Sequence, residues 1–277
     1  ERAALGYAPA DTTPLSLAEK KAALGLDPYD PSPIPPGIYL PNNGTSVTGG
    51  IYIVGNASNM RLSIDEYGFQ NYEVTDQNGV TKRIVLDKYN NRTKVYTGSD
   101  STIYQGLPRG MIYSTGNITN LGGPARVGGS PPPALDEDTQ VTITAEGDIV
   151  IDRDITYEAY DGSNCVLGIY SADGDVRIAT SAPNELLLDA FIMATGEYGC
   201  FTVDNFRYRS YSGQVHLRGG VVQRYYGPFG TFSWWGMTGY GRDFRYDRRG
   251  LAPPYYPLTS VFRVDQPVPH PTSWREV

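Results

Sequence analysis

Short β-strand runs recur along most of the chain and constrain its fold more than any other feature. Triplets of β-branched or aromatic residues alternate with small or polar turn residues in the runs 37–41, 49–56, 109–123, 141–157, 166–180, 186–203 and 213–226. Residues 168–172 resemble residues 191–195, and residues 175–179 resemble residues 200–204. A loose repeat of roughly 20–30 residues, all β with short turns, is typical of a β-solenoid. We therefore predict an all-β fold, a parallel β-helix whose stacked coils share one core.

An antiparallel β-sandwich is the alternative, because it also joins short strands by turns. The chain holds 32 Gly and 21 Pro among 277 residues, and both residue types disfavour helix interiors, which argues against a mainly helical fold. The Asn-Gly dipeptide typical of tight hairpins occurs only at 43–44 and 78–79. This scarcity favours the parallel arrangement.

The two ends of the chain differ from the repeats between them. Residues 1–36 form a cap or linker, in which Ser16 and Glu19 are spaced as a helix capping box and Gly25 can end the short helix that follows. We assign residues 37–232 to the solenoid. Residues 233–277 are rich in Arg, aromatic residues and Pro, so we expect an irregular tail that packs on the solenoid.

Two segments interrupt the predicted solenoid. Residues 65–105 fit the repeat poorly and contain Asn78-Gly79 between two β runs, so we expect a hairpin excursion from one coil. Residues 124–140 are too rich in Pro for regular structure and predict a loop.

The net charge of −7 hides an asymmetry along the chain. Residues 1–199 carry 13 basic and 25 acidic side chains, whereas residues 200–277 carry 10 basic and 5 acidic ones. Every basic residue of the second part is Arg. An acidic total argues against nucleic acid as a partner, but an Arg-rich end polarises the surface and removes that exclusion.

Several classes of site have no signal in the sequence. His216 and His270 are the only histidines, too few for a His-based triad or a His-rich metal site. Neither a Gly-X-Ser-X-Gly sequence nor a Walker loop occurs. No apolar run approaches the ~18 residues of a membrane span, so we expect no membrane contact by this chain itself.

Asp148, Asp152 and Asp154 are the best cluster of carboxylates. Residues two apart in a strand share a face, so the three side chains could project together. Such a cluster could hold Ca²⁺ as a cofactor, or it could supply an acid–base pair to a polysaccharide lyase or hydrolase. The alternative is that each Asp caps a coil corner on a solvated face.

Cys165 and Cys200 are the only cysteines, too few for a disulfide scaffold. In an exported protein they could form a disulfide, and two buried free thiols are the alternative. The sequence leaves both possibilities open.

Basic and aromatic side chains interleave after residue 200. Arg contacts phosphate groups and aromatic faces stack on bases, so this composition suits DNA, and exposed Trp and Tyr faces also suit a glycan. The candidate ligand-binding residues are Arg207, Arg209, Arg218, Arg224, Arg242, Arg245, Arg248, Arg249, Tyr211, Tyr246, Trp234 and Trp235. The alternative is that these aromatic rings cover the last coil and the Arg side chains stack on them.

The segments 219–232 (GGVVQRYYGPFGTF) and 239–257 (GYGRDFRYDRRGLAPPYYP), with Trp274 near the end, resemble a known domain of unknown function. That domain occurs in bacterial type IV pilin-like and PilX-like surface proteins of the Deinococcus–Thermus kind. Residues 110–118 and 146–157 resemble its earlier coils, so the resemblance covers roughly residues 105–277. Gly250 departs from the pattern, in which Leu directly follows Arg.

The resemblance implies a right-handed β-helix carried at the cell surface or on a pilus. The group includes large minor pilins of competence systems, which contact DNA during uptake. It further implies that the partners are other pilin subunits or envelope proteins.

We carry three hypotheses about function. The first is a non-enzymatic, surface-exposed module of a type IV pilus-related or cell-envelope protein that binds DNA or another extracellular ligand, such as a glycan. The second is a polysaccharide-active β-helix enzyme that uses the acidic face, and the third is a structural spacer.

Overall fold

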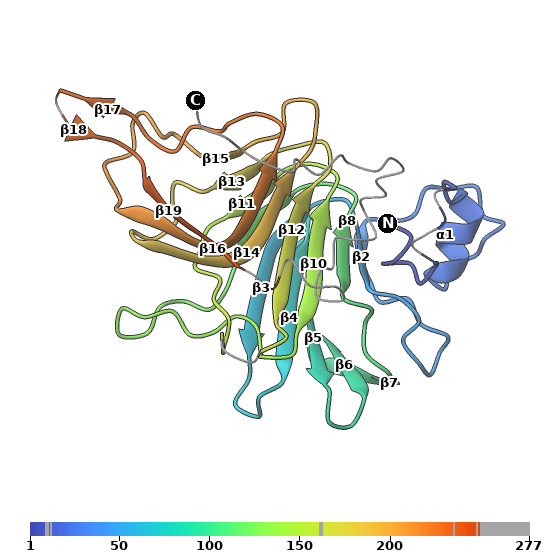
Figure 1. Cartoon of the computed structure of the whole chain (residues 1–277). Coiled ribbons are helices and arrows are strands. Elements are labelled where there is room, and N and C mark those ends of the chain that lie inside the picture. Colours follow the sequence, from blue (N-terminus) through green and yellow to red (C-terminus); the bar gives the residue numbers. More distant parts are fainter. Residues whose placement is uncertain (9–10, 12, 161–162, 235, 248, 250–277) are drawn as a thin grey trace, which may run out of the picture.

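The computed structural model describes residues 1–8, 11, 13–160, 163–234, 236–247 and 249. Its main feature is a parallel β-solenoid (Figure 1), as the repeat predicts. One sheet has the order β1-β2-β8-β10-β12-β14-β16-β19, and all its pairings are parallel except the one between β1 and β2. Its strands are β1 (Gly37–Tyr39), β2 (Ile51–Val54), β8 (Met111–Ser114), β10 (Gln140–Ala145), β12 (Val166–Ser171), β14 (Leu186–Ala194), β16 (Gln214–Gln223) and β19 (Gly241–Tyr246).

A second sheet completes the coils. Its parallel part has the order β15-β13-β11-β9-β3. These strands are β3 (Ala57–Ile64), β9 (Ile118–Gly122), β11 (Ile149–Ile151), β13 (Val176–Ile178) and β15 (Phe201–Val203). Each of the five coils from β2–β3 to β14–β15 therefore gives one strand to each sheet. The register aligns Gly168 with Phe191 and Val176 with Phe201, which confirms the two internal similarities seen in the sequence.

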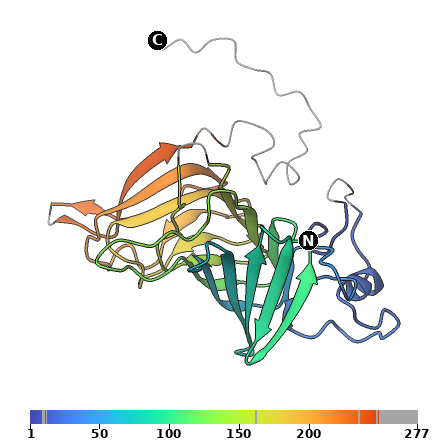
Figure 2. The ribbon, with the colours of Figure 1, turned by 90° about the horizontal axis from the view of Figure 1, so that it is seen from below.

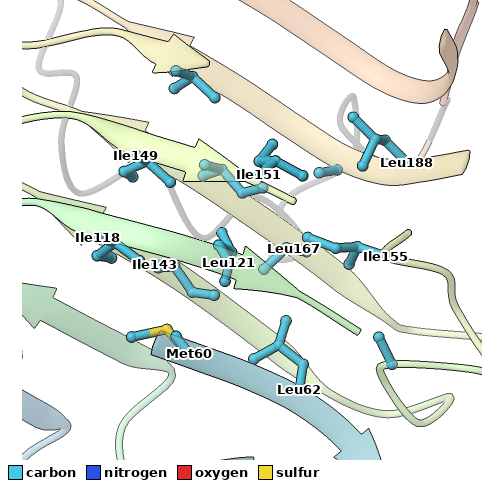
Figure 3. Close-up of a cluster of buried hydrophobic side chains, with 14 of the residues drawn as sticks. Met60, Leu62, Ile118, Leu121, Ile143, Ile149, Ile151, Ile155, Leu167 and Leu188 are labelled. Atoms are coloured by element: carbon cyan, nitrogen blue, oxygen red, sulfur yellow. The ribbon is translucent and has the colours of Figure 1, made fainter. Parts of the chain in front are cut away.

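Aliphatic side chains fill the space between the sheets (Figure 3). In the first sheet Ile112, Ile143, Ile169 and Ile192 occupy one register position in four successive coils, and all are at most 1% exposed. Parallel strands lie about 4.8 Å apart, so equivalent side chains of neighbouring coils are in direct contact. The β-branched residues that recur in the sequence are therefore the core of the solenoid.

A ladder of side-chain oxygens runs along one corner of the coils. Oδ1 of Asn56 accepts the backbone N–H of Asn117, whose Oδ1 accepts that of Asp148, and Oδ1 of Asp148 accepts that of Asp175. Oδ1 of Asp175 accepts the N–H of Cys200, and each of these four bonds is 2.8 Å long. At this corner the ladder thus gives a backbone N–H of each following coil a side-chain partner.

Each ladder residue follows a glycine. A Cβ atom on Gly147 would lie 2.0 Å from Oδ1 of Asn117, and one on Gly174 would lie 2.4 Å from Oδ1 of Asp148. Real Cβ atoms do not approach this closely, so the corner needs the Gly-Asn or Gly-Asp dipeptide.

An antiparallel meander leaves the first coil after β3. It consists of β4 (Gln70–Asp76), β5 (Thr81–Asp87), β6 (Arg92–Thr97) and β7 (Asp100–Gln105). The turn between β4 and β5 holds Asn78 and Gly79, so the predicted hairpin is confirmed. The excursion is larger than one hairpin, because β6 and β7 extend the same sheet.

The two ends of the molecule carry different elements (Figures 1 and 2). The helix α1 (Leu17–Ala23) lies at one end, and Ser16 and Glu19 form the predicted capping box. The hairpin of β17 (Phe232–Ser233) and β18 (Gly236–Met237) projects at the other end.

One expectation about the chain is corrected, and one alternative that the sequence left open is decided. The segment after residue 232 is not irregular up to residue 246, because β17 and β18 form a hairpin and β19 pairs with β16 in parallel. Most of the remaining expected tail lies outside the described residues. Cys165 and Cys200 are free, because Cys165 immediately precedes β12 in the first sheet whereas Cys200 sits at the ladder corner before β15.

Candidate binding surfaces on the last coils

The structure pairs the three candidate metal ligands with three different arginines. Asp148 lies in the corner ladder and has its other carboxylate oxygen 3.3 Å from Arg177. Asp152 accepts two hydrogen bonds of 2.6 Å from Arg61. Asp154 is 2% exposed and accepts two from Arg126, at 2.7 and 2.8 Å. Among the described residues no His, Cys, Asp and Glu side chains group to hold a metal, so the expected Ca²⁺ cluster is not formed.

Arg209 and Arg242 hold the end of the solenoid together. The Arg209 guanidinium donates to the carbonyl oxygen of Ala182 and to the Tyr240 hydroxyl, both at 2.6 Å, and stacks on the Tyr240 ring. Arg242 donates to the carbonyl oxygen of Gly227 at 2.6 Å, and burial lowers its pKa. Both residues therefore have the structural role given above as the alternative, in which Arg side chains stack on the aromatic rings that cover the last coil.

Two further arginines are paired with acidic neighbours. Arg249 pairs with Asp247 and donates to the carbonyl oxygen of Cys165 at 3.1 Å. Arg245 has a side chain 71% exposed and lies 3.1 Å from Asp243. Neither presents an uncompensated positive charge.

The remaining candidates are exposed, stacked on a ring or outside the described residues. Arg207 and Arg224 are exposed, and Arg218 stacks on the Tyr160 ring at 3.7 Å from its centre. Tyr211, Tyr246 and Trp234 are 45%, 59% and 96% exposed. Arg248 and Trp235 lie outside the described residues.

Exposed aromatic rings gather where the chain leaves β16. Tyr226, Phe232 and Trp234 are 75%, 84% and 96% exposed. A groove of about 630 Å³ is lined by residues that include Tyr226, Phe229, Phe232, Met237 and Arg242, and we call it the aromatic groove. The Arg242 guanidinium lies 4.2 Å from the ring centres of both Tyr226 and Phe229. The groove therefore combines exposed aromatic rings with a guanidinium that stacks on one of them, Tyr226.

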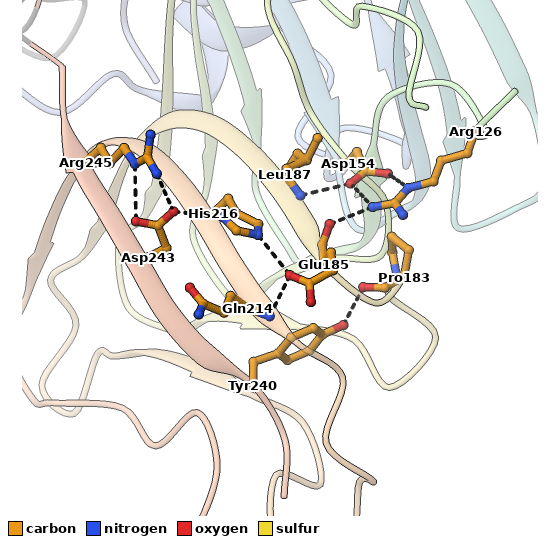
Figure 4. Close-up of polar contacts among 10 residues, drawn as sticks. All are labelled: Arg126, Asp154, Pro183, Glu185, Leu187, Gln214, His216, Tyr240, Asp243 and Arg245. Atoms are coloured by element: carbon orange, nitrogen blue, oxygen red, sulfur yellow. Dashed lines mark hydrogen bonds and ion pairs between the residues drawn. The ribbon is translucent and has the colours of Figure 1, made fainter. Parts of the chain in front are cut away.

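A row of polar side chains crosses the outer face of the last coils (Figure 4). His216 lies between two carboxylates, with Nδ1 2.9 Å from Asp243 and Nε2 2.9 Å from Glu185. The hydrogen bond to Asp243 and the bond to Glu185 raise the pKa of His216, although partial burial opposes them. The bond to His216 in turn lowers the pKa of both acids.

A cleft of about 300 Å³ lies beside this row. Its lining includes Tyr160, Leu187, Asp189, Arg218 and Arg245, and we call it the Asp189 cleft. Asp189 is 5% exposed, and burial raises its pKa.

Sequence reasoning missed the residues that shape both surfaces. Asp189 and Tyr226 were not candidates, because their surroundings depend on the register between coils. The register pairs Leu186 with Val215, which places Asp189 beside Arg218. The coils differ in length, so no fixed repeat could have given that pairing.

No described helix is long and apolar enough to cross a membrane. Comparison with protein-family models, with curated proteins and with solved structures gave no match.

Proposed function

We propose that this chain is a non-enzymatic binding module of a bacterial surface assembly and that its aromatic groove binds a carbohydrate. The observation that carries the proposal is the concentration of exposed rings around a groove at one end of the solenoid. Soluble proteins seldom leave contiguous apolar surface exposed unless it binds something. The C–H face of a sugar packs on an aromatic ring, while its hydroxyl groups bond to polar neighbours.

Four arginines of the last coils are already bonded within the protein, which favours a carbohydrate over DNA as the ligand. Binding to a nucleic acid depends on several basic side chains that each neutralise a phosphate. Arg209 and Arg242 donate to carbonyl groups, and Arg245 and Arg249 pair with acids. The groove therefore contributes ring faces rather than free positive charge.

The setting we propose is a type IV pilus-related or cell-envelope protein outside the cell, with pilin or envelope subunits as partners. The resemblance of residues 219–232 and 239–257 to pilin-like surface proteins supports this setting. A rigid stack of coils is suited to hold a binding surface away from its point of attachment.

Titration calorimetry against a panel of neutral polysaccharides and oligosaccharides tests the proposal. We expect one or more to bind and the double change Tyr226→Ala, Phe232→Ala to weaken binding at least about tenfold, because aromatic anchors dominate such surfaces. Tyr89→Ala is the matched control, since Tyr89 is 93% exposed on the meander.

Two outcomes would overturn the proposal. One is equal affinity of the double variant and the wild type. The other is binding of single-stranded DNA that falls steeply between 50 and 200 mM salt while no neutral glycan binds.

A further inference from the structure

The Asp189 cleft and the aromatic groove lie on opposite faces of β19. Successive side chains of a strand alternate between faces. Arg242 lines the aromatic groove, whereas its neighbour Asp243 and Arg245 line the cleft. The cleft is therefore a second surface, and its ligand does not follow from the proposed function.

Arg218 presents hydrogen-bond donors to this cleft. Its guanidinium stacks on Tyr160, and in the described part of the chain it has no hydrogen bond or ion pair. Arg218 is paired in register with Asp189 of β14 on one side and with Arg245 of β19 on the other. Two arginines on adjacent strands can approach one carboxylate together.

Asp189 presents an acceptor to the same cleft. Its Oδ2 accepts the backbone N–H of Tyr157 at 3.0 Å and the hydroxyl of Tyr160 at 2.7 Å. Within the described residues its Oδ1 has no hydrogen-bond partner, although the side chain is 95% buried. An acceptor left open toward a cleft, on a residue that is otherwise buried, favours a ligand that brings a hydroxyl donor.

The other lining residues limit the class of ligand. Leu187 adds an apolar surface between the charged groups, and the volume is at the small end of the range for ligand sites. The two arginines of the lining are matched by two carboxylates, Asp189 and Asp243, so little net positive charge remains to hold a multiply charged phosphate.

We propose that the Asp189 cleft binds one sugar-acid residue, a singly charged carboxylate that also carries hydroxyl groups. The ligand carboxylate contacts the Arg218 guanidinium, with Arg245 at the rim. A ligand hydroxyl donates to Oδ1 of Asp189, and the sugar ring packs on Leu187.

Titration calorimetry with a galacturonic acid trisaccharide, the matching neutral galactose trisaccharide and inorganic phosphate tests this proposal. We expect only the acidic trisaccharide to bind in the cleft. Arg218→Gln should weaken its binding at least about tenfold, because the lost hydrogen bonds are charge-assisted. Arg224→Gln is the control, since Arg224 is an exposed arginine outside the cleft.

The outcomes separate the cleft from the aromatic groove. The variant Tyr226→Ala, Phe232→Ala should keep its affinity for the acidic trisaccharide even if it loses neutral glycans. Thermal unfolding checks that the Arg218→Gln variant is folded. If that variant is unfolded, Arg245→Gln takes its place, and we expect it to lose affinity for the acidic trisaccharide several-fold. In the Tyr226→Ala, Phe232→Ala variant, whose aromatic groove no longer binds glycans, equal binding of the acidic and neutral trisaccharides or tighter binding of phosphate would overturn the proposal. Unchanged affinity for the acidic trisaccharide in a folded cleft variant would overturn it as well.

Discussion

Single side chains decide how one coil follows the next. At the corner between the two sheets, one Asn or Asp oxygen accepts the backbone N–H of the next coil, and the glycine before it leaves room for that oxygen. Asp148 belongs to this ladder, so its carboxylate has a structural task. The sequence pattern behind the ladder is a recurring Gly-Asn or Gly-Asp dipeptide, a signal separate from the β runs.

The substitution Asn117→Ala should destabilise the protein by about 1–3 kcal/mol, because it leaves the N–H of Asp148 without a partner in the corner. Urea unfolding measures this change in the free energy of unfolding. Asn184→Ala is the control, since Asn184 is exposed. Equal stability of the two variants would show that the ladder does not hold the corner.

His216 should make stability depend on pH. Its pKa is raised in the folded state, so its contribution is complete below its ordinary pKa of about 6.5 and is lost as the pH rises through the folded value. The pKa values of Asp243 and Glu185 are lowered in the folded state. The stability that these two acids contribute is complete above their ordinary pKa values and is lost as the pH falls through the folded values. His216, Asp243 and Glu185 together therefore stabilise the folded state most in mildly acidic solution.

An NMR titration of His216 checks this prediction. We expect a pKa above 6.5 in the wild type and a lower one in Asp243→Asn, which removes its main partner. The melting temperature should fall from pH 6 to pH 8.5, and it should fall less in His216→Gln. A wild-type His216 pKa at or below 6.5 would contradict the geometry of the row.

The meander and β19 show how elements depart from a simple repeat. The meander pairs antiparallel strands joined by tight turns, and its first turn was predictable from Asn78-Gly79. β19 was missed because three of the six residues of GRDFRY are charged and none is β-branched. Among the described strands it is the last in its sheet, with a strand neighbour on one side only, and charged side chains protect such an edge from further pairing.

Gly79→Ala should destabilise the protein by about 1–2 kcal/mol through backbone strain alone. Gly79 has φ +80°, a left-handed conformation, and a Cβ atom there would meet no other atom within 4 Å. Urea unfolding of Gly79→Ala beside Val80→Ala, at an exposed neighbouring position, isolates the effect. A loss no larger than that of Val80→Ala would contradict the strain argument.

At the scale of the whole molecule, the sequence predicts the solenoid better than it predicts the surfaces. The buried Ile ladders repeat in every coil, so their periodicity is visible in one dimension. A surface such as the Asp189 cleft joins residues of three coils of unequal length. The sequence can suggest single residues of such a surface, as it did for Arg218. The residues that surround them depend on the register between coils, which no local pattern encodes.

The number of arginines after residue 200 was a poor guide to the ligand, for a related physical reason. Net charge describes which groups are present, whereas binding depends on which groups remain unpaired after folding. Arg209 and Arg249 are joined to carbonyl oxygens far away in the chain, and this could not be read from their neighbours in sequence. The aromatic rings remain exposed, so they carry the proposed function.

Hydroxyl-radical footprinting of the aromatic side chains, with and without a saturating neutral glycan, tests the central claim most directly. We expect the glycan to protect Tyr226 and Phe232 from oxidation, while Tyr89, which is exposed on the meander, reacts as before. Protection confined to the meander, or none at the groove under saturating glycan, would contradict it.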